Sequence, residues 1–148
     1  IAAAKIPVAC LPHGAMVETL DGATLIEQIQ AGDLIRYPDG DIRPVVMKYE
    51  FMALPSEFVT MTFEDGTTIE LCAKHFIDGR FAEEYQIGEM VQEKRISDVS
   101  KSLRTVKTYD LLTDAPHGSY VTNGIVVESM IPYLHDVFEQ TGVFAEVR

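Results

Sequence analysis

The chain of 148 residues has little basic charge and only two cysteines, and it contains no tryptophan. Twelve lysine and arginine residues stand against 23 acidic residues, which gives a net charge of −11. Because no block of basic residues could neutralise a row of phosphates, we expect no nucleic-acid partner. No apolar run approaches the ~20 residues that a membrane span requires, so we expect no membrane partner either. We expect the domain to act as a monomer.

The two cysteines, Cys10 and Cys72, form no CxxC pair. This small number excludes a disulfide-dense scaffold. Three interpretations remain open for the pair: inert core residues, a single disulfide bridge, or reactive thiols.

Short strand-like runs, separated by turn residues such as Asp-Gly and Asn-Gly, make up most of the chain. The length suits one domain, and this pattern of short strand-like runs and turns predicts an all-β fold. The expected strands are Ala15–Leu20, Asp33–Tyr37, Val45–Tyr49, Phe58–Phe63, Thr67–Leu71, Met90–Gln92, Thr105–Leu112, Ser119–Val121 and Gly124–Val127.

Helical signals are few. The stretch "TLIEQI" begins with Thr24 and carries Glu27 three positions later, which is a capping-box pattern on a very short helix. Near the C-terminus, Leu134, Val137 and Phe138 have helical spacing, which predicts a second short helix.

An internal repeat links two loop regions. The segments Asp21–Ile35 and Asp78–Val91 align with a single gap, and each reads as a turn, a short helical element, a glycine and a strand. This order of elements predicts a β-fold built from two pseudo-symmetric halves. The matched positions are Glu27 with Glu83, Gln30 with Gln86, Gly32 with Gly88, Asp33 with Glu89, and Ile35 with Val91.

Four groups of residues could carry chemistry: Cys10, "LCAKHF" (Leu71–Phe76), "TYDL" (Thr108–Leu111) and "PHGSYVTNGIVVES" (Pro116–Ser129). Their order and spacing resemble the Hint superfamily, which includes inteins, bacterial intein-like domains and hedgehog autoprocessing domains. The resemblance implies an all-β, horseshoe-like Hint fold of two pseudo-symmetric halves, to which we add the short C-terminal helix. It divides the chain into an N-terminal flank (1–9), a Hint domain (10–129) and a C-terminal extension or downstream flank (130–148).

The resemblance also implies roles for single residues. Cys10 falls on the nucleophile, and His75 falls on the histidine of a Thr-x-x-His motif in which Cys72 replaces the threonine. Asp110 falls on a frequently functional carboxylate, and His117 falls where many inteins carry a second histidine. Taken alone, each of these has a plainer interpretation: a buried structural histidine, a packed cysteine, a solvated strand residue and an exposed loop residue.

The chemistry of Cys10 can be stated without the family. Its thiolate can attack the carbonyl of Ala9 through a five-membered ring, and the tether between the two groups favours the reaction. The product of this N-to-S acyl shift is a thioester at Ala9–Cys10. Asp110 could deprotonate Cys10 or orient a water, and His75 is the candidate proton donor for the departing nitrogen. His117 could assist a later proton transfer.

The substrate of this reaction is the chain's own N-terminal flank, and water, a thiol or an amine would take the acyl group from the thioester. No cofactor and no metal are implied. Splicing inteins end their last strand in His-Asn, whereas this chain has Glu128 and Ser129 at the C-terminal junction. Ser129 has no side-chain amide to cyclise, so we expect cleavage of the N-terminal flank rather than splicing.

Two other functions stay open. The first is a slow or inactive Hint-fold domain retained for binding or as a spacer. The second is a metal site, because Cys10, Cys72, His75 and His117 are ligand types that suit zinc. A disulfide between the two cysteines would block the nucleophile and act as a redox latch.

Overall fold

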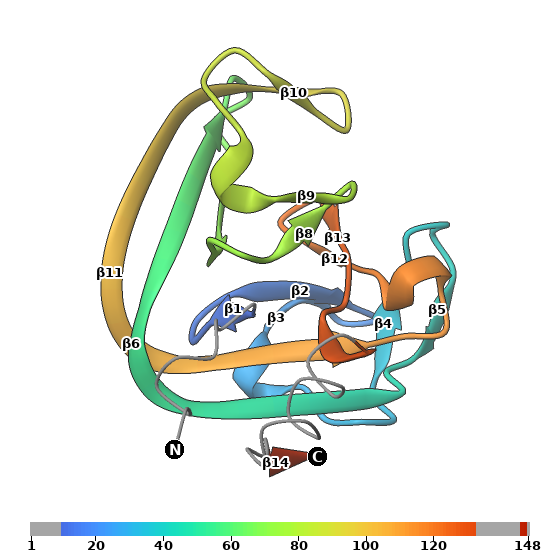
Figure 1. Ribbon diagram of the computed structural model, residues 1–148. Helices are drawn as coiled ribbons and strands as arrows, with labels where there is room; N and C mark the ends of the chain where they lie inside the picture. Colours follow the sequence, from blue (N-terminus) through green and yellow to red (C-terminus); the bar gives the residue numbers. More distant parts are fainter. Residues whose placement is uncertain (1–9, 133–145, 148) are drawn as a thin grey trace.

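The computed structural model describes residues 10–132 and 146–147 (Figure 1). Strands dominate it, which confirms the predicted all-β class; the predicted helix over Leu134, Val137 and Phe138 lies outside the described residues. The strands are β1 (Leu11–Pro12), β2 (Met16–Thr19), β3 (Gly22–Leu25), β4 (Leu34–Arg36), β5 (Ile42–Pro44), β6 (Met47–Phe63), β7 (Thr68–Cys72), β8 (Phe76–Ile77), β9 (Arg80–Phe81), β10 (Met90–Val91), β11 (Lys94–Leu112), β12 (Tyr120–Thr122), β13 (Ile125–Val127) and β14 (Glu146–Val147). Single 3-10 turns form η2 (Ile26–Gln28), η3 (Ala82–Glu84) and η4 (Pro116–Gly118).

Two long strands, β6 and β11, form the frame of the molecule. They pair antiparallel from one end to the other and bend together, so that they follow the base and one side of the fold in Figure 1. The register shifts inside the ladder, where Val106 pairs with Leu54 but Thr108 pairs with Phe51. The two residues of β6 between these partners face a single residue of β11, which is the geometry of a bulge and increases local bending.

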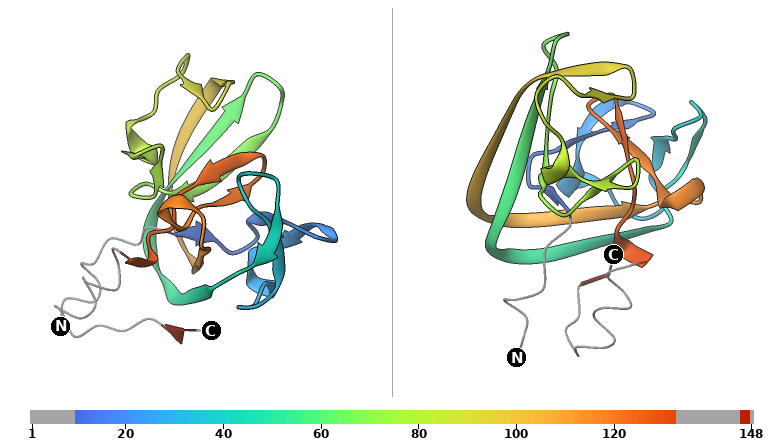
Figure 2. Two further views of the ribbon diagram at one scale, coloured as in Figure 1. Left: turned by 90° about the vertical axis from the view of Figure 1, so that its right-hand side faces the viewer. Right: turned by 45° about the horizontal axis from the view of Figure 1, so that its top comes forward.

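Shorter strands complete two six-stranded sheets around this frame, and β8 and β9 pair in a third, two-stranded sheet (Figure 2). One sheet has the order β1-β11-β6-β14, with β7 added to β6 and β10 to β11. The other has the order β13-β12-β2-β4-β5, with β3 paired to β2. Their buried side chains meet in a core that includes Val17, Ile35, Met61, Leu71 and Val127. Among the described residues there is no helix whose length and apolar character would let it cross a membrane.

The internal repeat is visible in the structure. The order β3-η2-β4 in the first copy corresponds to β9-η3-β10 in the second. Gly32 and Gly88 both have a φ near +90°, a conformation that glycine adopts without steric cost. The N–H of Gly32 donates to the carbonyl of Val45, and the N–H of Gly88 donates to the carbonyl of Ile96. Matching backbone bonds therefore support two pseudo-symmetric halves.

The predicted capping box does not form. The residue before η2 is Leu25, and no side chain caps the turn. Thr24 instead belongs to β3, where its hydroxyl lies 3.1 Å from that of Thr19, and the Glu27 carboxylate accepts a hydrogen bond from the N–H of Gly14. The pairing of β3 with β2 continues through Leu25, so strand pairing prevails over the local helix signal.

Candidate active site

Cys10 lies where the chain enters the fold. The next residue, Leu11, begins β1 and pairs with Tyr109 of β11. When this antiparallel register is extended by one residue, Cys10 lies opposite Asp110. Cys10 is fully buried, and its carbonyl accepts a 2.9 Å hydrogen bond from the N–H of Cys72. Cys10 is thereby held between the C-terminal part of β11 and the end of β7.

The two cysteines share one small apolar cluster. It consists of Cys10, Tyr49, Phe58, Cys72, Met130 and Ile131. Cys72 ends β7 and pairs with Phe58 of β6. Burial raises the pKa of the Cys72 thiol to about 12, so this thiol stays protonated at physiological pH. No disulfide joins Cys10 and Cys72, both of which lie in the described part of the chain.

His75 lies in the turn after β7, and its ring is buried. The turn is fixed by its backbone, because the His75 N–H donates to Cys72 and the His75 carbonyl accepts from Ala82. The ring Nε2 is 2.6 Å from the carbonyl oxygen of Glu128, the residue that follows β13. A carbonyl oxygen can only accept, so Nε2 must carry the proton in this hydrogen bond.

Asp110 is a fully buried carboxyl group that receives several donors. One of its oxygens accepts from the Tyr120 hydroxyl at 2.6 Å and from the N–H of Leu111 at 2.9 Å. The other accepts from the N–H of Met130 at 2.7 Å, and the N–H of Ile131 contributes a further hydrogen bond. Burial raises the pKa of Asp110 to about 7 although these donors act in the opposite direction. Near neutral pH the group therefore changes its charge.

Tyr120 is the functional candidate that sequence reasoning missed. It begins β12, is fully buried, and joins Asp110 through its hydroxyl. Burial raises the pKa of Tyr120 well above its usual value, and the negative charges of Asp110 and of Cys10 add to the rise. Tyr120 therefore remains a neutral hydrogen-bond donor, and the charges of Asp110 and Cys10 both affect its pKa. Nothing in its sequence neighbourhood separates it from an ordinary apolar strand position.

The predicted C-terminal junction lies beside this group. Glu128 and Ser129 follow β13, and Ser129 is 8% exposed. Met130 and Ile131 belong to the same apolar cluster as Cys10. The chain therefore stays packed on the fold beyond Ser129, and β14 pairs with β6 further on. Cys10 and the predicted C-terminal junction thus lie in one buried region, and Ala9 lies outside the described residues.

His117 is the one predicted histidine of the site whose side chain is exposed. It sits in η4 with φ 60° and ψ 20°, and its carbonyl accepts a 3.1 Å hydrogen bond from the N–H of Ser129. Its backbone therefore binds the predicted junction, while its side chain is exposed. Among residues 10–132 and 146–147, no group of three His, Cys, Asp or Glu side chains is arranged to hold a metal ion.

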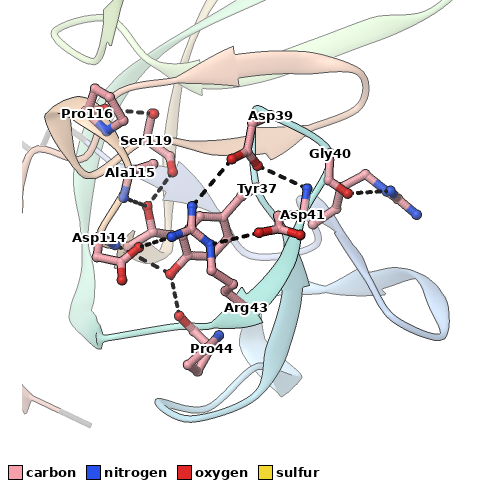
Figure 3. Close-up of polar contacts among 12 residues, drawn as sticks. Tyr37, Asp39, Gly40, Asp41, Arg43, Pro44, Asp114, Ala115, Pro116 and Ser119 are labelled. Atoms are coloured by element: carbon pink, nitrogen blue, oxygen red, sulfur yellow. Dashed lines mark hydrogen bonds and ion pairs between the residues drawn. The ribbon is translucent and has the colours of Figure 1, made fainter.

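The loop that carries His117 is held from below by Arg43 of β5 (Figure 3). The guanidinium lies 4.2 Å from the centre of the Tyr37 ring and forms ion pairs with Asp39, Asp41 and Asp114. Asp114 stands at the start of the loop between β11 and β12. This network therefore links the β4-β5 turn to the segment that supports the C-terminal junction.

Comparisons with known proteins identify the fold. Neither a family model nor a curated protein matches this sequence. Among solved structures, the splicing domain of the Msm DnaB1 intein, solved with bound zinc, is 22% identical with a TM-score of 0.67, and the match covers 80% of this chain and 98% of that one. The bacterial intein-like domain from Clostridium thermocellum is 21% identical with a TM-score of 0.63, over 82% and 99% of the two chains.

A DnaB intein from Synechocystis sp. is similar in shape at lower identity. It is 16% identical with a TM-score of 0.63, and the match covers 81% of this chain and 97% of that one. Each match therefore spans nearly the whole length of the intein domain. These similarities confirm the predicted Hint fold: the chain folds as inteins and bacterial intein-like domains do.

Proposed function

We propose that this chain is a self-processing domain that cleaves its own peptide bond between Ala9 and Cys10. The observation that carries the proposal is the burial of Cys10 in one cluster with Met130 and Ile131, the residues that follow the predicted C-terminal junction. Cys10 also lies next to Asp110 and the turn of His75. A cysteine at the entrance of a Hint fold, held in that position by backbone bonds, suits an intramolecular nucleophile. The substrate is the N-terminal flank itself.

The reaction begins with the Cys10 sulfur attacking the carbonyl carbon of Ala9. The C–N bond of that peptide then breaks, the nitrogen of Cys10 takes up a proton, and a thioester joins Ala9 to the sulfur. Water, a thiol or an amine attacks the thioester and releases the flank. Because nucleophile and carbonyl are one residue apart, their proximity supplies a large part of the rate acceleration.

Asp110 is the base in this proposal. Its pKa of about 7 lets it take a proton from the Cys10 thiol near neutral pH, and the register of β1 with β11 puts the two residues opposite one another. The Tyr120 hydroxyl, bound to the same carboxyl group, stabilises the ionised form of Asp110.

His75 is the acid that protonates the departing nitrogen of Cys10. Its Nε2–H is engaged with the Glu128 carbonyl, so the proton delivered to Cys10 has to come from Nδ1 of the imidazolium. The N–H of Cys72 donates to the carbonyl of Cys10, and the N–H of His75 donates to the carbonyl of Cys72, which keeps the backbone of His75 close to Cys10. Splicing is not part of the proposal, since Ser129 has no amide to cyclise.

A precursor with an affinity tag before Ile1 tests the proposal. Mass spectrometry after incubation at pH 7 should show a cut between Ala9 and Cys10, and dithiothreitol should accelerate it by capturing the thioester. Cys10→Ala should remove the cut. His75→Ala should slow it about 10²–10⁴-fold. His13→Ala is the matched control and should leave the rate unchanged, because His13 is 54% exposed and binds Glu27.

A precursor that is folded and still intact after days with dithiothreitol would refute the proposal. That result would favour the alternative of an inactive Hint-fold domain that serves in binding or as a spacer.

A further inference from the structure

The Glu128–Ser129 peptide is held by hydrogen bonds on both sides. The N–H of Glu128 donates to the carbonyl of Phe76 at 3.2 Å, and the Glu128 carbonyl accepts from His75 Nε2 at 2.6 Å. The N–H of Ser129 donates to the carbonyl of His117 at 3.1 Å. This peptide therefore has a fixed position and a proton donor on its carbonyl oxygen, next to a residue that carries a hydroxyl.

We propose that Glu128–Ser129 is a second self-cleavage site, at which Ser129 is the nucleophile and His75 stabilises the oxyanion. This activity is separate from the cut at Ala9–Cys10, because it uses a different nucleophile and a different carbonyl. It does not need the asparagine that this chain lacks at the junction.

The first step is an N-to-O acyl shift. The Ser129 Oγ attacks the carbonyl carbon of Glu128 through a five-membered ring, and negative charge grows on the carbonyl oxygen. The C–N bond breaks, an ester forms between Glu128 and Oγ, and the proton lost by Oγ is returned to the nitrogen of Ser129. The shift is an isomerisation and needs no co-reactant. Water then hydrolyses the ester, which leaves a carboxyl group at Glu128 and a new amino terminus at Ser129.

The Nε2–H of His75 already lies where an oxyanion needs a donor. A positioned donor in a buried site stabilises the transition state more strongly than water does, and removal of one such donor costs about 10²–10³ in rate. Ser129 is only 8% exposed, which keeps bulk water from competing for the oxyanion.

Two further contacts stabilise the Ser129 nucleophile and the segment that follows it. The N–H of Ile131 lies 3.3 Å from Ser129 Oγ and donates to it, which stabilises this oxygen as it loses its proton. The carboxyl group of Asp110 accepts a 2.7 Å hydrogen bond from the N–H of Met130, which fixes the chain after Ser129 while the peptide reacts. The structure thus supplies a hydrogen-bond donor for the oxyanion (His75), a hydrogen-bonded hydroxyl group (Ser129) and a fixed segment after the scissile bond.

The test follows the untagged chain by mass spectrometry at pH 7, with and without hydroxylamine, which captures esters. We expect two fragments, residues up to 128 and residues 129–148, and hydroxylamine should increase their yield and leave a hydroxamate at Glu128. Ser129→Ala should abolish these fragments. Ser119→Ala is the matched control and should leave them unchanged, because Ser119 is equally buried (6% exposed) but its hydroxyl donates to Pro116.

Ser129→Cys provides a second readout, because a thiol is the stronger nucleophile and dithiothreitol captures the resulting thioester. The cut at Ala9–Cys10 gives fragments of different mass, so failure of either cleavage is recognised independently of the other. Fragments that persist in folded Ser129→Ala would overturn the role of the hydroxyl. If wild type with hydroxylamine and Ser129→Cys with dithiothreitol both stay intact while circular dichroism shows them folded, the second site does not exist. Cleavage of Ser129→Cys alone would refute serine as the natural nucleophile.

Discussion

The buried carboxyl group of Asp110 predicts an unusual dependence of stability on pH. Asp110 is fully buried, and burial raises its pKa from 3.8 to about 7. In the unfolded chain this group ionises near pH 4, whereas in the folded protein it stays protonated until about pH 7. Between these values the unfolded state gains a charge that the folded state does not. The free energy of unfolding should therefore fall as the pH rises through this window and level off above it.

The size of the effect follows from the shift in pKa. A difference of about 3 pKa units between the two states, at 1.36 kcal/mol per unit, corresponds to roughly 4 kcal/mol. A domain of this size has a total stability of about 5–15 kcal/mol, so one carboxyl group would control a large share of it. This decrease in the free energy of unfolding should be nearly complete at pH 7.5.

The assay compares Asp110 with Asp110→Asn, both in a Cys10→Ala background that prevents the proposed cleavage at Ala9. Urea unfolding followed by circular dichroism at pH 4, 5.5 and 7.5 gives the two free energies of unfolding. Asparagine does not titrate, so the other carboxylates cancel in the difference between the variants. The Asp110 protein should become about 4 kcal/mol less stable relative to Asp110→Asn between pH 4 and 7.5.

Two results would contradict this reasoning. A difference that does not change with pH would mean that the pKa of Asp110 is the same in both states. If the Asp110 protein instead gained stability relative to Asp110→Asn as the pH rises, the hydrogen-bond donors around the carboxylate would outweigh its burial and lower the pKa of Asp110.

Three further predictions concern the surroundings of the site. The Cys72 thiol, whose pKa is raised to about 12 by burial, should resist iodoacetamide at pH 8 until the protein is denatured; rapid labelling of native protein in peptide mass mapping would contradict this. Gly118→Ala should lower the free energy of unfolding by about 2–4 kcal/mol, because at a φ of +62° its Cβ would lie 2.4 Å from Leu112 Cδ1 and 2.9 Å from Ser129 Cβ; an unchanged melting temperature would disprove it. Arg43→Ala should cost only about 1–2 kcal/mol in urea unfolding, since partly exposed ion pairs are individually weak and three of them are lost; a loss above 4 kcal/mol would contradict that estimate.

Local patterns were sufficient for the strand content and the repeat. Alternating runs and Asp-Gly or Asn-Gly turns depend on neighbours in the chain, so they could be read without a structure. The two glycines of the repeat, Gly32 and Gly88, have the same backbone conformation for the same local reason. The capping box at Thr24 was wrong because β3 pairs with β2 up to Leu25, and that pairing is not a local property.

The long strands show the limit of such patterns. The sequence predicted separate strands at Val45–Tyr49 and Phe58–Phe63. In the structure β6 continues through Pro55, which pairs with Thr105 of β11. The first part of β11 was missed because most of its residues are exposed, so its sequence has no alternating apolar pattern.

By itself, the sequence determined the fold class, the pseudo-symmetric repeat and the residue types that could react: a thiol at Cys10, an imidazole at His75 and a carboxyl group at Asp110. Only the tertiary structure decided what these groups face. His75 meets the carbonyl of Glu128, 53 positions away, because β13 returns past the end of β7, and Asp110 holds Met130 because the chain packs back onto β11. Contacts between residues so far apart depend on how the sheets close around one core, which no stretch of neighbouring residues encodes.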